Sequence, residues 1–250
     1  MWWSLKKNYQ NIFELNNLFA ILLSYFIGSI PSAIWIGKWF FGIDVRDYGS
    51  NNAGATNTFR VIGKTAGFTV LFIDILKGWV SVKILTSFLL CSPDSVEFIN
   101  MQIIVGITAV LGHVFPIYEK FQGGKGVATL MGIILAINFS AAIGCVVIFL
   151  LIFIFTNYVS LGAIIAAISF PIITILIIRV ESITLMYFSI FISILVLFTH
   201  KPNIYRLLSK NENKMNIKLK KDSTNWIRLR YMGFYFSLFS LIKLIYFSVI

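Results

Sequence analysis

Six long runs of apolar residues, separated by short polar segments, dominate the pattern of the chain. They cover approximately residues 18–40, 66–92, 101–118, 127–155, 160–179 and 183–199. A helix needs about 20 apolar residues to cross a bilayer, so most of these runs fit single transmembrane helices. The runs are continuous and lack the alternation of a membrane β-strand. The pattern therefore predicts an all-α integral membrane protein.

The run 127–155 is long enough to be one tilted helix or two short ones. Lysine and arginine decide between these alternatives: the segment 38–64 has four, 119–126 has two and 200–230 has nine. Basic segments collect on the cytoplasmic side, and these three share a side only if 127–155 crosses twice. We therefore expect a helical break near Asn138 and about seven transmembrane helices, some of them short, with the N-terminus outside.

The ends of the chain suggest three parts. Residues 1–17 form an N-terminal segment, 18–214 the membrane domain, and 215–250 a basic tail that ends in an apolar helix. Small and polar residues recur along one face of 231–250, which fits either an eighth span or an amphipathic helix on the inner leaflet. The first apolar run lacks a small-residue cleavage site at its end, so we expect it to be retained as a span.

Composition supports a membrane protein and excludes several other classes. Of 250 residues, 58% are hydrophobic and only 12% are charged, which is not a soluble composition. In such a chain a net charge of +11 reports topology and attraction to anionic lipid, so we expect no nucleic-acid partner. Cys91 and Cys145 both lie in apolar surroundings without metal-ligand spacing, and we expect neither a metal nor a cofactor.

The first polar cluster, "YGSNNAGATNTFR" at residues 48–60, follows directly after an apolar run. Its small residues let the backbone approach a ligand, and successive N–H groups can form a nest for an anion. Arg60 adds a planar cation suited to phosphate. Further donors are supplied by Ser50, Asn52, Thr56 and Asn57. The alternative is an ordinary turn-rich loop with a topology arginine.

The second cluster, "GHVFPIYEKFQGGKGVAT", spans residues 112–129 and contains Gly123, Gly124, Lys125 and Gly126. The glycines and the lysine directly precede an apolar run, which places them at a helix N-terminus, where backbone N–H groups and the helix dipole attract phosphate. The spacing differs from that of a nucleotide P-loop. The alternative is a helix cap with a topology lysine, and His113 is more typical of a packed histidine than of a catalyst.

The third cluster, "HKPNIYRLLSKNENK", begins at His200, where the last apolar run ends. Pro202 predicts a helix start there, with Asn203 in its first turn. A histidine at the membrane boundary can bind a substrate hydroxyl or accept its proton, although interfacial anchoring is the alternative. Separately, Asp74 and Lys77 lie three residues apart inside the second run, and we expect them to form an ion pair facing the bundle interior.

Five segments together resemble one family: "GSNNAGATNTFR", "DILKG", "GHVFP…FQGGKGVAT", "TNYVSLG" and "HKPNIYRLLSKNE". They occur in the order and with the spacing of the bacterial acyl-phosphate:glycerol-3-phosphate acyltransferases, and the resemblance covers roughly residues 18–214. It implies a seven-helix enzyme of the bacterial cytoplasmic membrane, with its three motif loops facing the cytoplasm. The implied reaction transfers a fatty acyl group from acyl phosphate to the 1-hydroxyl of sn-glycerol 3-phosphate. Lysophosphatidate and inorganic phosphate are released, as the first step of phospholipid biosynthesis.

The resemblance also implies residue roles. Ser50 and Arg60 match the family's essential serine and arginine, and Lys125 matches the lysine of its glycine-rich phosphate loop. His200 and Asn203 match the polar pair after the last helix, with Glu212 as a supporting glutamate. The implied partners are the two substrates, membrane lipid and the enzyme that makes acyl phosphate.

Three positions depart from the family pattern, which usually has glycine at Asn51, lysine at Gln122 and glycine at Lys210. Asparagine tolerates left-handed backbone, so the first change is mild. A different class of function, a transporter or flippase for a phosphorylated metabolite, also fits basic loops and intramembrane charges. Its binding site should lie near the midplane and be reachable from both sides, whereas the polar clusters here share one side.

Overall fold

The computed structural model describes residues 2–87, 92 and 95–215, and throughout these residues the regular structure is helical. Its α-helices are α1 Trp2–Gly28, α2 Ser32–Ile36, α3 Ala55–Val61, α4 Lys64–Ser87, α5 Val96–Val114, α6 Val127–Ile137, α7 Phe139–Thr156, α8 Val159–Ile172, α9 Ile183–Thr199 and α10 Lys201–Leu208. Two π-helices, η1 Gly37–Phe41 and η4 Ile173–Ile177, and two 3-10 turns, η2 Val45–Asp47 and η3 Ile117–Glu119, extend or connect them. Cys91 and the apolar helix expected at 231–250 lie outside the described residues.

Within the part of the chain that the structure describes, five helical segments are long and apolar enough to cross a membrane: Glu14–Phe41, Lys64–Lys83, Val96–Glu119, Phe139–Thr156 and Val159–Ile177. A sixth candidate is the pair α9 and α10, which is bent by 63° at its break. The eleven-residue helix α6 is apolar but short for a full crossing. The predicted all-α membrane architecture is therefore confirmed, while a count of seven crossings stays a prediction.

The expected break in the run 127–155 is present and has a local cause. Helix α6 ends at Ile137 and α7 begins at Phe139, and the side chain of Asn138 accepts a hydrogen bond from the Ala141 amide at 2.9 Å. Asparagine is a strong N-cap, so this residue starts a new helix. The break inferred from charge is confirmed.

The first apolar run, which we expected to be retained as a span, lies within one candidate span, Glu14–Phe41, whose helix is interrupted. Helix α1 already begins at Trp2 and ends at Gly28, and α2 begins at Ser32. Pro31 stands between them, where it lacks an N–H group and disfavours helical geometry in the residue before it. The proline therefore bends the chain where it leaves α1, and the short helix α2 leads toward the first polar cluster.

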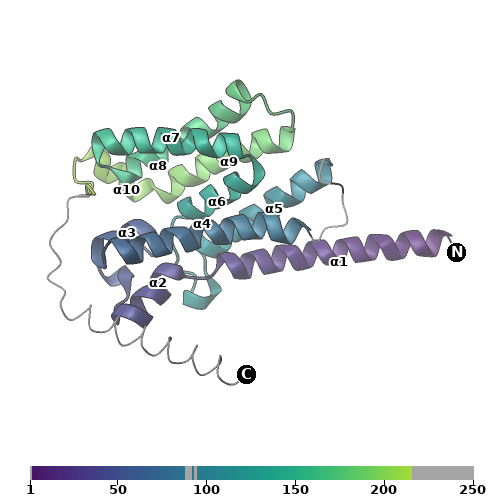
Figure 1. The fold of residues 1–250 in the computed structure, drawn as a ribbon, viewed down its shortest axis with the longest axis horizontal. Helices are drawn as coiled ribbons and strands as arrows, with labels where there is room; N and C mark the ends of the chain where they lie inside the picture. The colour runs from purple at the N-terminus through teal and green to yellow at the C-terminus, as the bar shows by residue number, and fades with distance from the viewer. Residues whose placement is uncertain (1, 88–91, 93–94, 216–250) are drawn as a thin grey trace, which may run out of the picture.

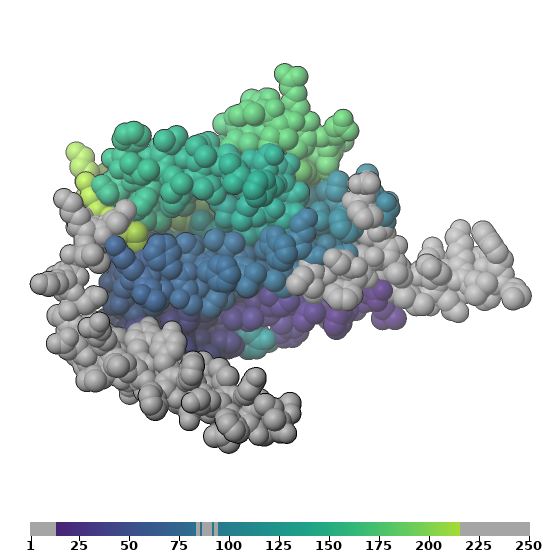
Figure 2. Space-filling model, in the orientation of Figure 1, coloured from purple at the N-terminus to yellow at the C-terminus, as the bar shows by residue number. Residues whose placement is uncertain are grey.

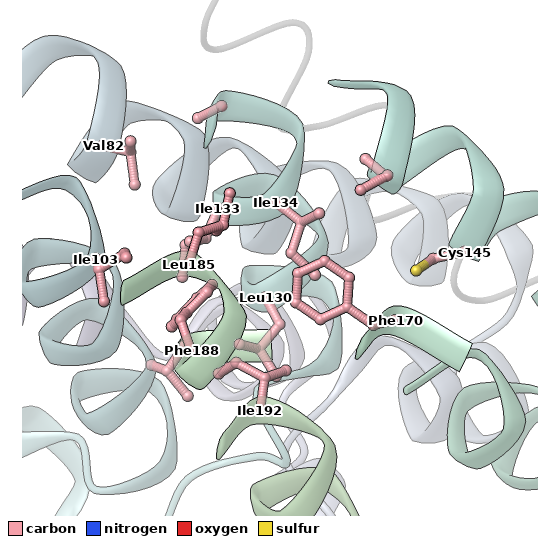
Figure 3. Close-up of a cluster of buried hydrophobic side chains, with 14 of the residues drawn as sticks. Val82, Ile103, Leu130, Ile133, Ile134, Cys145, Phe170, Leu185, Phe188 and Ile192 are labelled. Carbon is pink, nitrogen blue, oxygen red and sulfur yellow. The ribbon is translucent and has the colours of Figure 1, made fainter. Parts of the chain in front are cut away.

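The helices form two groups with α6 between them (Figure 1). Helices α1, α4 and α5 pack together in one group, and α7, α8 and α9 in the other. The side chains of α6 are buried at the centre of the core, where Leu130 and Ile133 lie among Phe170 of α8 and Phe188 and Ile192 of α9 (Figure 3). The short helix therefore joins the two groups through apolar burial.

Two glycines bring α6 into backbone contact with α4. A Cβ added to Gly132 would lie 1.9 Å from the carbonyl oxygen of Ile75, and one added to Gly78 would lie 2.1 Å from that of Thr129. Small residues permit such close approach between membrane helices. The contact fixes the N-terminal half of α6, and with it the end of the GGKG segment.

The outward face of α7 is apolar. Its exposed large side chains include Phe139, Val147, Leu151, Ile154 and Phe155. The second helix group forms the teal and green surface along the top of Figure 2. An apolar outer surface on a helix of this length is what a lipid environment requires, and the chain is accordingly a multi-pass membrane protein.

Candidate active site

The three polar clusters of the sequence meet in space. Lys125 of the second cluster donates a hydrogen bond from its Nζ to Asn203 Oδ1 of the third. Arg60 of the first donates from Nη2 to the carbonyl of Asn213 at 3.1 Å. The fold thus joins residues that lie far apart in sequence. We refer to Arg60, Lys125, His200, Asn203 and Glu212 as the central cluster.

Glu212 is the hydrogen-bonded centre of this cluster. Its Oε1 accepts from Ser160 Oγ at 2.8 Å and from Asn203 Nδ2 at 2.7 Å, and its Oε2 accepts from Arg206 Nε at 2.7 Å. Burial acts to raise the pKa of this carboxyl, but the hydrogen bonds from Arg206, Asn203 and Ser160 outweigh it and lower the pKa. Glu212 is therefore ionised and balances the surrounding cations.

Arg60 and Lys125 are partly desolvated cations. Burial lowers the pKa of Lys125 to about 8, an effect opposed by Glu212 and reinforced by Arg206 and Arg60. Burial likewise lowers the pKa of Arg60. Arg60 Nε is buried and, among the described residues, has no hydrogen-bond partner. A buried donor on a cation without a partner is costly, and an anionic oxygen would satisfy it.

His200 lies between α9 and α10 and is 3% exposed. Its Nδ1 is 2.9 Å from the carbonyl oxygen of Val196, which can only accept, so Nδ1 carries the proton and donates it. In the neutral ring Nε2 is then a hydrogen-bond acceptor. Pro202 lies in the first turn of α10, which confirms the helix start expected there and places Asn203 one turn from His200.

The first cluster is organised by Asn57, and this corrects the expectation that its amide contacts phosphate. Its Nδ2 donates to the carbonyls of Val45 at 2.6 Å and Tyr48 at 3.1 Å, so both amide hydrogens are used within the loop. Its Oδ1 accepts from Ser50 N at 2.8 Å and from Ser50 Oγ at 3.1 Å. An amide oxygen is no base, so this arrangement does not activate Ser50 as a nucleophile. Asn52 and Thr56 lie partly buried beside it.

The second cluster also differs in detail from expectation. Gly123 N donates to the carbonyl of Val114 at 3.1 Å and Gly124 N to that of His113 at 3.2 Å, so these two amides bind α5 rather than a ligand. Gly126 has a left-handed φ of 79° and immediately precedes α6. The first-turn N–H groups of a helix have no acceptor within it. The groups of this loop that can bind an anion are therefore the Lys125 ammonium and the N-terminus of α6.

Two residues that bind Glu212, namely Arg206 and Ser160, belong to no motif that predicts a role in the site. Arg206 lies one turn after Asn203 on α10, and Ser160 belongs to the "TNYVSLG" segment that was noted without a role. Arg46, in the turn η2 just before the first cluster, also contacts the second cluster: its Nη2 lies 2.9 Å from Glu119 Oε2, and its Nη1 donates to the Gln122 carbonyl at 3.2 Å. Arg46 and Glu119 lie too far apart in the sequence for a local motif to predict their contact.

Two departures from the family pattern occupy special backbone. Asn51 has a φ of 55° and Lys210 a φ of 59°, both in the left-handed region that favours glycine. Asn51 also donates from Nδ2 to the Arg46 carbonyl at 2.8 Å, which helps to hold this conformation. The side chain of Gln122, the third departure, is exposed. None of the three departures changes the central cluster.

Asp74 and Lys77 form the expected buried ion pair, with Lys77 Nζ 3.0 Å from Asp74 Oδ1. The pair lies on α4 behind the GGKG segment rather than in the central cluster. A supporting role for it stays a prediction at this point.

Comparison with known proteins gives consistent matches over the membrane domain. The family model described as glycerol-3-phosphate acyltransferase matches residues 18–210. A glycerol-3-phosphate acyltransferase of Fusobacterium nucleatum is 45% identical over 194 residues, covering 78% of this chain and 95% of the relative. One from Staphylococcus carnosus is 43% identical over 196 residues, covering 78% and 96%.

Solved structures agree with these matches. The crystal structure of PlsY (YgiH), an integral membrane glycerol 3-phosphate acyltransferase, in its glycerol 3-phosphate form has a TM-score of 0.72 and 36% identity, covering 80% of this chain and 96% of that one. Its lysophosphatidic acid form has a TM-score of 0.70 and 35% identity, covering 80% and 95%.

Proposed function

Since the chain belongs to the glycerol-3-phosphate acyltransferase family, we propose that its acyl donor is an acyl phosphate and that the central cluster carries out the transfer. The acyl group passes to the 1-hydroxyl of sn-glycerol 3-phosphate, giving lysophosphatidate and inorganic phosphate. The observation that carries the proposal is that two partly buried cations, Arg60 and Lys125, lie together with His200, whose neutral imidazole has Nε2 as a hydrogen-bond acceptor. Two phosphorylated substrates beside an apolar bundle need such an arrangement.

The proposed reaction is a single acyl transfer. The 1-hydroxyl oxygen attacks the acyl carbonyl carbon and forms the ester C–O bond. The bond between that carbon and the phosphate oxygen breaks, and phosphate leaves with the electron pair. Arg60 and Lys125 hold phosphate oxygens, while Asn203 and Ser50 orient the glycerol phosphate. Because phosphate is a good leaving group, positioning and charge stabilisation supply most of the rate, and no acyl-enzyme is required.

His200 Nε2 is the acceptor for the hydroxyl proton in this scheme. We expect His200→Gln to lower kcat about a hundredfold, because glutamine can accept a hydrogen bond but cannot take up a proton. Steady-state kinetics with both substrates saturating measure the effect. If the variant turns over at nearly the rate of the wild type, His200 only positions the hydroxyl.

The pH dependence of kcat/KM should report the ionisation of the Lys125 ammonium. Its ammonium must be protonated to bind an anion, and its pKa in the free enzyme is lowered to about 8. The dependence of kcat/KM on pH reflects ionisations of the free enzyme. We therefore expect kcat/KM to be level below about pH 7, to reach half of that value near pH 8 and to fall about tenfold per pH unit above about pH 9. Burial is the main cause of the lowered pKa, which Glu212 opposes and Arg206 and Arg60 reinforce.

Lys125→Arg provides the matched control for that profile. Arginine stays charged across this range, so the alkaline fall should disappear from whatever activity the variant retains. Enzyme-free samples at each pH correct for spontaneous hydrolysis of the acyl phosphate. An alkaline fall that persists unchanged in Lys125→Arg would assign the ionisation to another group.

The donor is tested with purified protein, sn-glycerol 3-phosphate and either palmitoyl phosphate or palmitoyl-CoA, following lysophosphatidate and phosphate. The proposal requires product from palmitoyl phosphate and equal amounts of lysophosphatidate and phosphate. Product from the thioester alone would show that the donor is misassigned. Failure with both donors, in folded protein, would return the transporter reading to consideration.

The proposal extends to the membrane that holds the enzyme and to the orientation of the enzyme in it. The basic segments 38–64 and 119–126 and the central cluster would face the cytoplasm of a bacterial inner membrane, where the positive-inside rule puts them. Acyl phosphate reacts readily with water, so delivery from the enzyme that forms it would favour a site on that side. Labelling of single cysteines introduced in these segments, with an impermeant reagent, tests the orientation.

A further inference from the structure

A buried polar cluster lies behind the GGKG segment, on elements that the mechanism above does not use. Asp74 Oδ1 accepts a hydrogen bond from Ser32 Oγ at 2.7 Å and contacts Lys77 Nζ at 3.0 Å. Lys77 also donates to the carbonyl of Ile30 at 2.9 Å. Both charges are therefore paired and further hydrogen-bonded, as buried ions must be. These bonds tie α4 to α2 and to the connection that precedes it.

His113, in the last turn of α5, links this buried cluster to the phosphate loop. Its Nδ1 is hydrogen-bonded to Thr129 Oγ1 at 3.1 Å and lies 3.7 Å from Asp74 Oδ1. Thr129 is fully buried in the first turn of α6, four residues after Lys125. A side-chain bond thus connects the end of α5 to the helical turn that follows the lysine.

The Nε2 edge of the His113 ring lies against the loop itself. A Cβ added to Gly124 would be 2.3 Å from His113 Nε2 and 2.8 Å from the carbonyl of Ala53. Beneath the loop is a small pocket of about 10 Å³, enough for one water molecule, which is lined in part by Lys77, His113 and Gly124. The backbone bonds of Gly123 and Gly124 to α5, the His113–Thr129 bond and the imidazole contact together hold the loop in place.

We propose that His113 and Thr129 are positioning residues that set the place of the GGKG loop and so aim Lys125 at the substrate phosphate. The inference rests on the proposed function, which gives Lys125 its phosphate. Lys125 lies in the loop two residues before α6, and Thr129 lies in the first turn of that helix, so a shift of this turn displaces the loop that carries the ammonium.

Thr129→Val removes the hydroxyl while keeping the shape of the side chain. We expect it to raise KM for one phosphorylated substrate about tenfold, with kcat changing far less, because the loop is displaced but the reacting groups remain. The substrate affected should be the one whose KM rises in Lys125→Met. Thr129→Ser keeps the hydroxyl and should restore KM.

Thr86→Val is the matched control. Thr86 is also a buried threonine, but its hydroxyl donates to the Val82 carbonyl within α4, nine residues beyond Lys77. It should leave KM unchanged. The inference is overturned if Thr129→Val keeps the wild-type KM, or if Thr86→Val raises KM equally.

Amide hydrogen exchange gives a readout that does not need turnover. We expect faster exchange in residues 121–126 of Thr129→Val than in the wild type, Thr86→Val or Thr129→Ser, since the loop loses one of its ties. Protein that lacks acyltransferase activity would refute the proposed function, and this comparison would still test the positioning role. Equal exchange in all four proteins would refute that role.

Discussion

We expect Lys125→Met to lower kcat/KM for acyl transfer by about 10²–10³-fold, a loss of the size found when one charge-stabilising donor is removed. Methionine matches the length of the lysine stem but has no charge to offer a phosphate oxygen. The change also leaves Asn203 Oδ1 without its donor, which costs about 1–3 kcal/mol of stability when a buried group is unpaired. Steady-state kinetics with palmitoyl phosphate and glycerol 3-phosphate measure the loss.

Lys201→Met is the control for this variant. Lys201 is exposed at the start of α10, directly beside His200. Its replacement by methionine removes the same charge near the site. The variant should keep nearly wild-type kcat/KM. A loss in Lys201→Met as large as that in Lys125→Met would mean that general positive charge, rather than a specific contact, supports activity.

Glu212→Gln should have the second large effect, on activity and stability together. The carboxylate accepts three hydrogen bonds, and a glutamine amide would turn donor hydrogens toward some of those donors. It would also leave Arg60, Lys125 and Arg206 without their shared counter-charge. We expect kcat/KM to fall about a hundredfold and the free energy of unfolding to fall by about 1–3 kcal/mol.

Thermal unfolding in detergent and the transfer assay measure these two effects. Glu181→Gln, an exposed carboxylate in the loop before α9, is the matched control and should change neither. If Glu212→Gln kept its activity and lost only stability, Glu212 would hold the segment after α10 without organising the cations.

The sequence predicts the long helices because each is a continuous apolar run, and it predicts the break at Asn138 because charge on the flanking segments requires it. It does not predict the bend at Pro31, because a proline near the end of an apolar run is compatible with a kinked but continuous span. Helix α1 also begins at Trp2, before the apolar run, since polar residues can occupy a helix outside the membrane.

In the candidate site, residue types and spacing indicate which residues gather but not which atoms they use. Asn57 looks like a phosphate donor in sequence, yet its amide is consumed by the carbonyls of Val45 and Tyr48. The Gly123 and Gly124 amides are likewise taken by α5. Hydrogen-bond partners of this kind depend on the path of the backbone, which composition and spacing do not determine.

In the proposed mechanism, the cations of the central cluster hold a phosphorylated substrate. The most direct measurement is equilibrium binding of labelled glycerol 3-phosphate to the wild type, Arg60→Gln and Arg179→Gln. Arg179 is an exposed arginine in the loop between η4 and α9, so its change removes the same charge away from the site. We expect Arg60→Gln to bind at least about tenfold more weakly than the wild type and Arg179→Gln to bind normally. Equal affinity for all three proteins would contradict this mechanism.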